Sequence, residues 1–356
     1  MTEVCSVDPF VDPDWDRFVE SHPQGWLIHL SGWKRVIERS FPGIHGHYLA
    51  VRQGGNIRAA FPVYVVEHLY LGKRLVSIPF ATLCHPLAEE DGDIESLLEA
   101  ALRLGSKEKA AGLEVRAMRS VNVLERNGTA VSREYKIHYL LLEKGPEALK
   151  ARFDRTCVRQ RIARSEKSNL VLSKVEDRAG LRDFYRLYVK TRRRLGLPPH
   201  PYNFIESLWD EFAPSGKLVI WMASHADHPV SGLLLLKFRD RVSAEYLVTD
   251  ETFRERNPNH FLFWHAIRES HREGYRIFDF GRTSESNHGL MDFKRRWGTV
   301  VDTLPVYYPS RKKGLQPING MGHGDKKWIG VLKSVLQHVP DSLLEQVGTM
   351  YYRHLG

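Results

Sequence analysis

Hydrophobic residues in the first half of the chain alternate between the two-residue period of a strand and the 3.6-residue period of a helix. The expected elements are a strand at 3–7, helices at 12–21 and 31–41, strands at 47–52, 57–67 and 70–79, a helix at 94–111, and strands at 113–116 and 136–142. Ser31 is a suitable N-cap for the second helix, and Gly54-Gly55 separates two of the three successive strands. These strands are therefore expected to form an antiparallel meander.

The same order of elements returns after Gly145-Pro146. The expected elements are a basic helix, a strand at 170–175, helices at 181–195 and 202–212, strands at 218–224, 230–238 and 241–248, a helix at 260–273, and a strand at 276–280. We interpret the recurrence as an internal duplication; the alternative is that two domains of this kind share the order by chance.

This pattern predicts a mixed α/β protein with two tandem domains, each with its own mostly antiparallel sheet flanked by helices. A length of 356 residues also favours two domains. We expect them at 1–145 and 146–310, followed at 311–356 by an amphipathic helical tail, containing Trp328 and Leu332, that packs on the first domain. Ligands should bind where neighbouring strands diverge, which in the second domain falls after Val248 and Phe280.

The chain is basic, with a formal net charge of +9 and a pI near 9.4, which favours polyanionic partners or serves solubility alone. Cys5, Cys84 and Cys157 match no disulfide or zinc spacing. The longest aliphatic run, 233–236, is too short to span a bilayer, and the start lacks the blocks of a secretory signal. We therefore expect a cytoplasmic protein, with contact at the inner membrane face left open, and neither a metal site nor a DNA partner.

The most specific stretch is Phe278-Asp279-Phe280-Gly281-Arg282, followed by Phe293-Lys294-Arg295-Arg296-Trp297-Gly298. It resembles the FemAB/FemX-like transferases, whose domains are of the GNAT acyltransferase type. The likeness covers nearly the whole chain, because Trp33 and the Ser77-Ile78-Pro79-Phe80 segment also resemble the first domain of that family. The sequence is most similar to the branch associated with exopolysaccharide and protein-sorting systems, and it lacks the coiled-coil arm of the classical branch.

The resemblance implies transfer of an acyl or aminoacyl group onto an amine of a cell-envelope precursor, peptidoglycan or polysaccharide. No tightly bound cofactor is implied; the donor would be aminoacyl-tRNA, with tRNA as a partner, or acyl-CoA. The acceptor would be an anionic nucleotide-sugar or lipid-linked precursor. Two alternatives remain, an acyl-CoA-dependent N-acyltransferase and a catalytically silent adaptor that binds an anionic lipid or nucleotide-sugar carrier.

The resemblance gives Lys294 the central catalytic role, in which its charge would stabilise developing negative charge or bind an anion. We expect it to be partly exposed; the alternative is a solvated lysine beside Arg295 and Arg296. The expected substrate-binding residues are Tyr246, Thr191, Arg193 or Arg194, Tyr202, Arg282, Phe293 and Trp297 in the second domain, with Trp33 and Lys34 in the first. Tyr246 could instead pack in the core.

Acyl transfer to an amine also needs a proton acceptor, for which Asp279 and Glu245 are the candidate carboxylates. Asp279 could instead cap the loop that follows it, and the substrate itself could remove the proton. For the donor, coenzyme-A enzymes of this type use a glycine-rich loop; Arg254, Asn257 and Asn259 occupy the corresponding cofactor-binding positions with Asn in place of small residues. The equivalent segment of the first half, 89–93, is acidic and predicts no phosphate site.

A basic segment links the predicted domains. Its cations include Arg152, Arg155, Arg159, Arg161, Arg164 and Lys167. It forms either a phosphate or tRNA contact surface or a solvated helix face, and the sequence leaves the two open.

Overall fold

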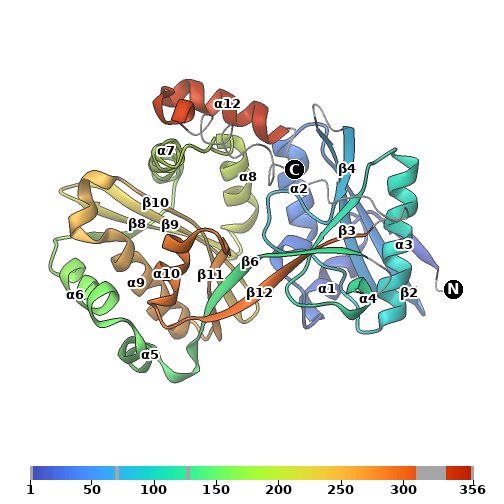
Figure 1. The fold of residues 1–356 in the computed structure, drawn as a ribbon, viewed down its shortest axis with the longest axis horizontal. Coiled ribbons are helices and arrows are strands. Elements are labelled where there is room, and N and C mark those ends of the chain that lie inside the picture. The colour runs from blue at the N-terminus through green and yellow to red at the C-terminus, as the bar shows by residue number, and fades with distance from the viewer. Residues whose placement is uncertain (1–2, 69–71, 126–128, 310–333, 354–356) are drawn as a thin grey trace. The chain divides into compact units, whose positions relative to one another are not determined.

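The computed structural model describes residues 3–68, 72–125, 129–309 and 334–353, which divide into two compact units (Figure 1). The first unit contains 3–68, 72–125, 129–135, 303–309 and 350–353, and the second contains 136–302 and 334–349. The mixed α/β fold expected from the sequence is confirmed. Trp328 and Leu332 of the expected tail lie outside the described residues.

The first unit consists of a mixed sheet with a long helix against it. In chain order its elements are β1 (Val4–Val7), α1 (Pro13–Ser21), η1 (Leu27–His29), α2 (Ser31–Ser40), β2 (His45–Gln53), β3 (Asn56–His68), β4 (Gly72–Val76), α3 (Asp91–Lys107), β5 (Leu113–Arg116) and α4 (Asn122–Glu125). β1 to β4 pair antiparallel in sequence order, and β5 adds parallel to β4. Buried residues of α3 at helical spacing, Ile94, Leu97, Leu98 and Ala101, pack on this sheet and form its core.

The second unit repeats this plan. Its elements are η2 (Leu142–Lys144), α5 (Pro146–Arg152), the π-helical turn η3 (Arg155–Arg159), α6 (Gln160–Glu166), β7 (Val171–Lys174), α7 (Arg178–Arg194), α8 (Tyr202–Phe212), β8 (Leu218–His225), β9 (His228–Phe238), β10 (Arg241–Thr249), η4 (Glu251–Arg256), α9 (Pro258–Arg272), β11 (Ile277–Ser284) and α10 (His288–Arg295). Three further elements contribute residues to both units: β6 (Ala130–Leu141), β12 (Val300–Tyr308) and α12 (Asp341–Arg353). β7 to β10 are antiparallel, and β11 is parallel to β10.

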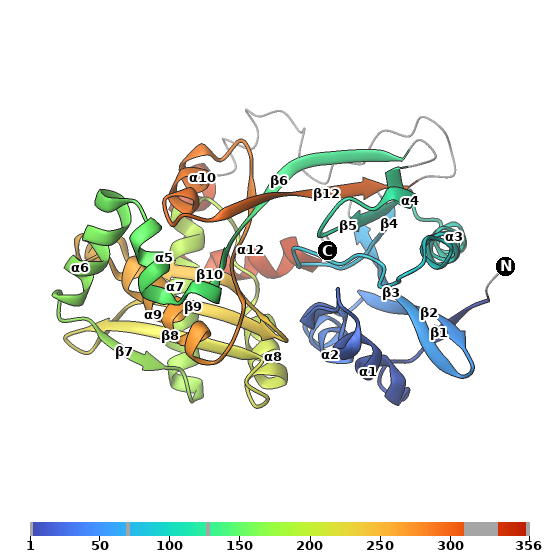
Figure 2. The ribbon, with the colours of Figure 1, turned by 90° about the horizontal axis from the view of Figure 1, so that it is seen from below.

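Two helices cover opposite faces of the second sheet, α7 on one side and α9 on the other (Figures 1 and 2). Alternate residues of β9 face the two helices: Gly232 lies against Phe184 of α7, while Leu233 belongs to the core cluster that includes Leu262 and Trp264 of α9. β9 is buried over most of its length for this reason.

Two strands are shared between the units, because β6 and β12 each contribute residues to both. In hydrogen-bonding order the strands of the first unit run β1-β2-β3-β4-β5-β12, and those of the second run β6-β11-β10-β9-β8-β7. β12 had no counterpart among the expected elements, and β6 begins at Ala130, before the expected start at residue 136.

The described part of the tail contacts α7. Arg193 forms an ion pair with Asp341 at 2.9 Å, and Gln337 Nε2 donates to the carbonyl oxygen of Arg194 at 2.9 Å. Residues 334–349 group with the second unit and 350–353 with the first.

Candidate active site in the second unit

The two central strands of the second unit, β10 and β11, separate early. Their parallel pairing joins residues 241–243 to 277–279. In the antiparallel pairing with β9, Ala244 lies opposite Leu235 and Tyr246 opposite Leu234, so that Glu245 is an extra residue in a β-bulge. The divergence therefore follows Ser243 and Asp279, upstream of the predicted points at Val248 and Phe280, because the bulge turns β10 away.

β11 also departs from regular geometry after Asp279. It continues to Ser284, past the predicted end at Phe280, and Gly281 has a φ of +75°. A Cβ atom at Gly281 would lie 3.3 Å from the carbonyl oxygen of Ala244, so both the conformation and the close approach favour glycine. The kink directs the carbonyl groups of Gly281 and Arg282 towards α10.

Lys294 lies at the centre of this region. Asn287 caps α10 by accepting a 3.2 Å hydrogen bond from the backbone of Leu290, and Met291 and Lys294 occupy the buried side of the helix. Lys294 Nζ donates to the carbonyl oxygens of Gly281 at 2.7 Å and Arg282 at 3.3 Å. The side chain is only 5% exposed, so the prediction of a partly exposed lysine is wrong, because α10 turns this face onto β11.

Burial changes the acid–base behaviour of Lys294. It lowers the pKa of the ammonium group to about 8, and the negative charges of Asp279 and Glu245 oppose the decrease. Since the pKa remains above 7, the lysine stays mainly charged at neutral pH. The site therefore holds a positive charge with little surrounding water.

Asp279 is the first carboxylate beside this charge. Its side chain is buried, its Oδ1 accepts a 2.7 Å hydrogen bond from the backbone of Gly281, and its Oδ2 lies 3.7 Å from Nη1 of Arg241. Burial raises its pKa, while Arg241, the Gly281 hydrogen bond and Lys294 oppose the increase. Asp279 thus holds the kink in place, which is the capping role that the sequence analysis gave as the alternative to catalysis.

Glu245, the bulged residue of β10, is the second carboxylate. It is half-buried, and its Oε1 accepts a 2.7 Å hydrogen bond from the hydroxyl of Ser243. Burial raises its pKa; the Ser243 hydrogen bond lowers it and the charge of Asp279 raises it further, while Lys294 and Arg282 lower it. Lys294, Asp279 and Glu245 therefore form one electrostatic group, to which Arg282 contributes.

His138 was not among the residues predicted for the site. It lies on β6 and is fully buried; its Nδ1 is 3.2 Å from the hydroxyl of Thr299 and its Nε2 3.2 Å from the sulfur of Met291. Burial, with the charges of Lys294 and Arg295, lowers its pKa to about 4, so the imidazole is neutral. Thr299 also donates to the carbonyl oxygen of Lys294 at 3.1 Å, which fixes the end of α10. A single histidine in a strand gave no sequence signal for this contact.

The aromatic residues of the motif fasten α10 to the core. Trp297 is fully buried and stacks on His260, with ring centroids 5.7 Å apart, and Phe293 packs on the same cluster. Both had been predicted to bind substrate. Trp297 has no exposed surface for a ligand, and its observed contribution is packing.

Tyr246 belongs to a second aromatic group, which includes Tyr188 of α7 and His200. Its half-buried ring lies 5.3 Å from that of Tyr188 and 5.9 Å from that of His200, and the Tyr188 hydroxyl is 2.7 Å from Nδ1 of His200. Thr191 accepts a 3.0 Å hydrogen bond from the backbone of Thr249, linking α7 to β10. Tyr246 directly follows Glu245 in β10, so one strand carries both candidates.

The other predicted acceptor residues have contacts elsewhere. Arg193 pairs with Asp341 as described, Arg194 pairs with Glu251 at 3.2 Å, and the ring of Tyr202 lies 5.1 Å from that of Tyr185. These partners are tail, η4 and α7 residues rather than members of the Lys294 group. Their role in acceptor binding stays a prediction.

The loop expected to contact a donor is tied to the sheet. Asn257 adopts the left-handed conformation, with φ +55°, and Pro258 begins α9. Asn259 accepts hydrogen bonds from Ser231, at 3.2 Å, and from Thr249. Its side chain therefore joins α9 to the ends of β9 and β10, and proline removes one backbone donor from the helix start. Arg254 is exposed on η4.

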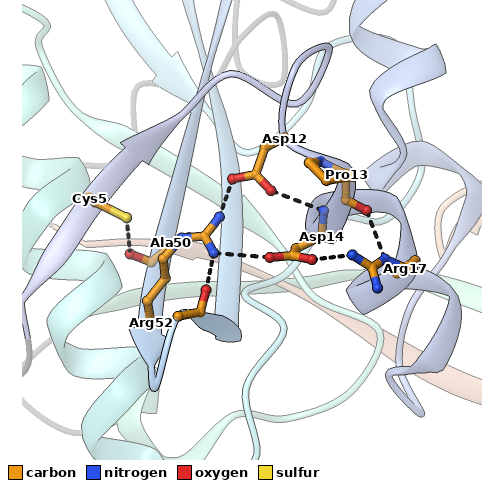
Figure 3. Close-up of polar contacts among 8 residues, drawn as sticks. Cys5, Asp12, Pro13, Asp14, Arg17, Ala50 and Arg52 are labelled. Carbon is orange, nitrogen blue, oxygen red and sulfur yellow. Dashed lines mark hydrogen bonds and ion pairs between the residues drawn. The ribbon is translucent and has the colours of Figure 1, made fainter.

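The first unit contains the other two predicted residues and a cavity of its own. Trp33 is buried in α2, and Lys34 forms an ion pair with Glu38. The cavity, of about 480 Å³, is lined by Cys5, Ser6, Val7, Asp8, Val11, Asp12, Pro13, Asp14 and Arg52. Figure 3 shows Arg52 between Asp12 and Asp14, and Arg17 beside Asp14. The lining carries more carboxylates than cations, so the cavity lacks the surplus of cations that a phosphate would need.

Comparisons with known proteins agree with this architecture. Residues 152–295 match the acetyltransferase (GNAT) domain family. The chain is 22% identical over 381 aligned positions to a lipid II:glycine glycyltransferase of Staphylococcus saprophyticus, covering 82% of this chain and 89% of that protein. The crystal structure of FemX superposes with a TM-score of 0.70 at 16% identity, covering 86% of this chain and 96% of FemX. The predicted resemblance to the FemAB/FemX-like transferases is confirmed.

Two further comparisons extend the FemX-like assignment of the fold. A lipid II:glycine glycyltransferase of Staphylococcus haemolyticus is 20% identical, covering 80% of this chain and 88% of that protein. The L-PGS structure from Bacillus licheniformis has a TM-score of 0.57 at 14% identity and covers 92% of this chain and 98% of its own. Among the described residues no helix is long and apolar enough to cross a membrane. In the same part of the chain, no three or more His, Cys, Asp or Glu side chains are grouped to hold a metal ion.

Proposed function

We propose that this protein transfers an aminoacyl or acyl group onto an amine of a cell-envelope precursor, and that the reaction takes place at Lys294, Asp279 and Glu245. The observation that carries the proposal is the buried, charged Lys294 held by β11 at the point where β10 and β11 separate. The relatives named lipid II:glycine glycyltransferases support an acceptor of this kind, since lipid II is a lipid-linked precursor.

Lys294 would stabilise the negative charge that forms during transfer. Attack of an amine on an acyl carbonyl produces an oxyanion, and a fixed donor in a site with little water stabilises it far more strongly than solvent does. A lysine ammonium has three donors, and the carbonyl oxygens of Gly281 and Arg282 accept two of them. The third is directed to the reacting oxygen in this mechanism.

Glu245 is the better candidate for the proton acceptor. Asp279 already accepts from Gly281 and lies beside Arg241, whereas Glu245 is half-buried and accepts from the hydroxyl of Ser243. Its raised pKa brings the carboxylate nearer to the operating pH, which favours general-base catalysis. In this scheme the acceptor ammonium first loses one proton to Glu245, and its nitrogen then attacks the acyl carbonyl. As the bond between the acyl carbon and the donor oxygen or sulfur breaks, Glu245 returns that proton to the leaving atom and takes the second proton from the nitrogen, which leaves the amide.

The donor is an aminoacyl-tRNA or an acyl-CoA. The start of α9 carries Asn257, Pro258 and Asn259 where a pyrophosphate-binding loop would need small residues, and Asn259 is engaged with β9 and β10. This favours aminoacyl-tRNA over coenzyme A. A lipid-linked acceptor would in turn require peripheral contact with the inner membrane face.

The proposal is tested by incubating the purified protein with peptidoglycan precursors, lipid-linked and nucleotide-linked, in the presence of labelled aminoacyl-tRNA or acyl-CoA. Mass spectrometry should detect an acceptor whose amine carries the new acyl group, and the Lys294→Met variant should give none. Binding of the precursor with no product from any donor would instead identify the silent adaptor.

A further inference from the structure

Ser243 is a buried residue of β10 beside the two carboxylates of the candidate site. Its hydroxyl donates a 2.7 Å hydrogen bond to Oε1 of Glu245. We propose that Ser243 is a positioning residue for proton transfer, which holds the Glu245 carboxylate charged and oriented so that Glu245, rather than Asp279, accepts the proton of the acceptor amine. The inference rests on the proposed function and deepens it.

The packing of β10 shows which side of the sheet Ser243 occupies. Val242 belongs to the core cluster that includes α9, and Ala244 and Leu247 pack against the same cluster. Ala244 and Leu247 are three residues apart, where a regular strand would require two or four, because the bulge inserts Glu245 between them. Ser243 alternates with Val242 and Ala244, so its side chain lies on the opposite side of the sheet, away from α9.

Asp279 lies on that same side of the sheet. The parallel pairing of β10 and β11 places Ser243 opposite Asp279, and Phe278, directly before Asp279, belongs to the cluster that includes α9. The two carboxylates are therefore neighbours of one serine, Asp279 across the strands and Glu245 along the strand. The serine hydroxyl donates to Glu245, whereas Asp279 accepts from the backbone of Gly281.

This division of hydrogen bonds makes the two carboxylates unequal. A serine hydroxyl has one proton to donate, so it serves one carboxylate at a time. Burial raises the pKa of Glu245 and the charge of Asp279 raises it further, while the hydrogen bond from Ser243 lowers it. Without that bond Glu245 would be protonated over a wider pH range, and a protonated carboxyl group cannot accept the proton of the substrate.

The other groups around Glu245 leave this hydrogen bond as a distinct influence. The charges of Lys294 and Arg282 also lower its pKa, and both cations keep their charge at acidic and neutral pH. On the side of α7, burial raises the pKa of Tyr188 and lowers that of His200, so both are neutral at neutral pH. A change in the titration of Glu245 after removal of the serine hydroxyl would therefore report on the lost hydrogen bond.

The hydrogen bond also distinguishes the two oxygens of Glu245. Oε1 accepts from Ser243, which leaves Oε2 to take the proton of the acceptor amine. Ser243 keeps its own proton throughout and forms no bond to the substrate. Because its effect is exerted through Glu245, loss of the hydroxyl should have little further consequence once the carboxylate has been removed.

The test compares Ser243→Ala, Glu245→Gln and the variant that combines them. Ser270→Ala is the matched control, because Ser270 is also a buried serine of the second unit and its hydroxyl donates to the carbonyl oxygen of Ala266 at 2.7 Å. Transfer rates are measured over acidic and neutral pH at several acceptor concentrations, which gives kcat and KM separately. Thermal melting checks that every variant folds.

We expect the acidic limb of the pH–rate profile to move upward by about one pH unit in Ser243→Ala, because a hydrogen bond that favoured the charged carboxylate is lost. The kcat should fall roughly tenfold, as expected for partial loss of a general base, with little change in the acceptor KM. Ser270→Ala should keep the wild-type profile. Adding Ser243→Ala to Glu245→Gln should change the rate by less than about twofold. An unchanged profile in Ser243→Ala, or a full further loss in the combined variant, would overturn the proposal.

A measurement that needs no turnover separates this inference from the proposed function. The side-chain carboxyl signal of Glu245 is followed by carbon NMR in protein labelled at glutamate, and Glu245→Gln identifies it by its disappearance. Its titration should move to higher pH in Ser243→Ala and stay unchanged in Ser270→Ala. Product formed with an unchanged titration would overturn this inference and leave the transferase proposal standing. A shifted titration without product from any donor would overturn the transferase proposal, and with it the role of Ser243 in proton transfer.

Discussion

The ammonium group of Lys294 lies 2.7 Å from the carbonyl oxygen of Gly281, the residue at which β11 kinks. This hydrogen bond joins the catalytic candidate to the backbone kink that supplies its acceptors. A charged donor buried against two carbonyl oxygens is held in one position, which is what stabilisation of a developing charge requires.

Replacing Lys294 tests this role. We expect Lys294→Met to lower the transfer rate by roughly two orders of magnitude or more, because the oxyanion loses its donor. Lys294→Arg should recover little activity, since a planar guanidinium does not fit the geometry of a single ammonium. Near-normal turnover in Lys294→Met, measured by initial rates, would contradict the assignment.

Two substitutions of Lys294 are expected to differ in their effect on the unfolding free energy. Because Lys294 is buried, Lys294→Ala leaves a void and is expected to cost about 1 to 3 kcal/mol of unfolding free energy. Lys294→Met keeps most of the volume and removes a buried charge, so it should cost less than Lys294→Ala. Urea unfolding of both variants gives the comparison, and an equal loss in the two would point to the ammonium contacts rather than to packing.

The lowered pKa of Lys294 predicts a pH dependence of stability with a definite sign. The pKa of Lys294 is about 8 in the folded protein, against the ordinary lysine value of 10.5 that applies in the unfolded chain. Between these values the unfolded chain holds a proton that the folded chain has lost, so the unfolding free energy contributed by this group rises with pH. Relative to Lys294→Met, the wild type should therefore gain stability from pH 8 upwards. A difference that stays constant from pH 7 to pH 9.5 would disprove the shift.

Glu245→Gln should test the proton acceptor. The substitution keeps the shape of the side chain and its position next to Ser243 but removes the base, so we expect a rate loss of about 10² to 10⁴. Because burial raises the pKa of Glu245, the wild-type rate should fall with decreasing pH at values above the ordinary range of glutamate. Glu285→Gln, at an exposed position before α10, is the matched control and should retain the wild-type pH profile.

Trp297 is expected to matter for folding rather than for chemistry. Its ring is fully buried among Phe280, Phe263 and His260. Trp297→Ala should cost about 3 to 5 kcal/mol of unfolding free energy, and Trp297→Phe considerably less. Thermal melting would show this order; a large loss of activity in a Trp297→Phe protein of normal stability would favour the substrate-binding role predicted from the motif.

Local periodicity predicted most elements because each one buries a single face. The expected helix at 202–212 coincides with α8, and the strand at 113–116 coincides with β5. The β10 bulge was not predictable in this way, since Glu245 continues an ordinary strand pattern and only the pairing with β9 shows the extra residue. β12 was missed because its pairing partners lie far away in the sequence.

The sequence identified Lys294, Asp279 and Glu245, and the structure brings them together in one electrostatic group. Their burial could not be predicted, because exposure depends on which face α10 turns to β11. His138 escaped notice for a related reason: its contacts, Met291 and Thr299, belong to elements that follow more than a hundred residues later.

The passage of β6 through both units limits how the protein can be divided for expression. A fragment that begins at residue 146 would lack β6, the neighbour of β11, together with Leu140 and Leu142 of the second core. β11 would then become an unpaired edge, which is prone to aggregation. A fragment that ends at residue 145 would lack Tyr307, whose hydroxyl accepts from the backbone of Val121 at 3.0 Å in the first unit. Recombinant work on either half therefore requires the intact chain or a designed linker that restores the missing strand.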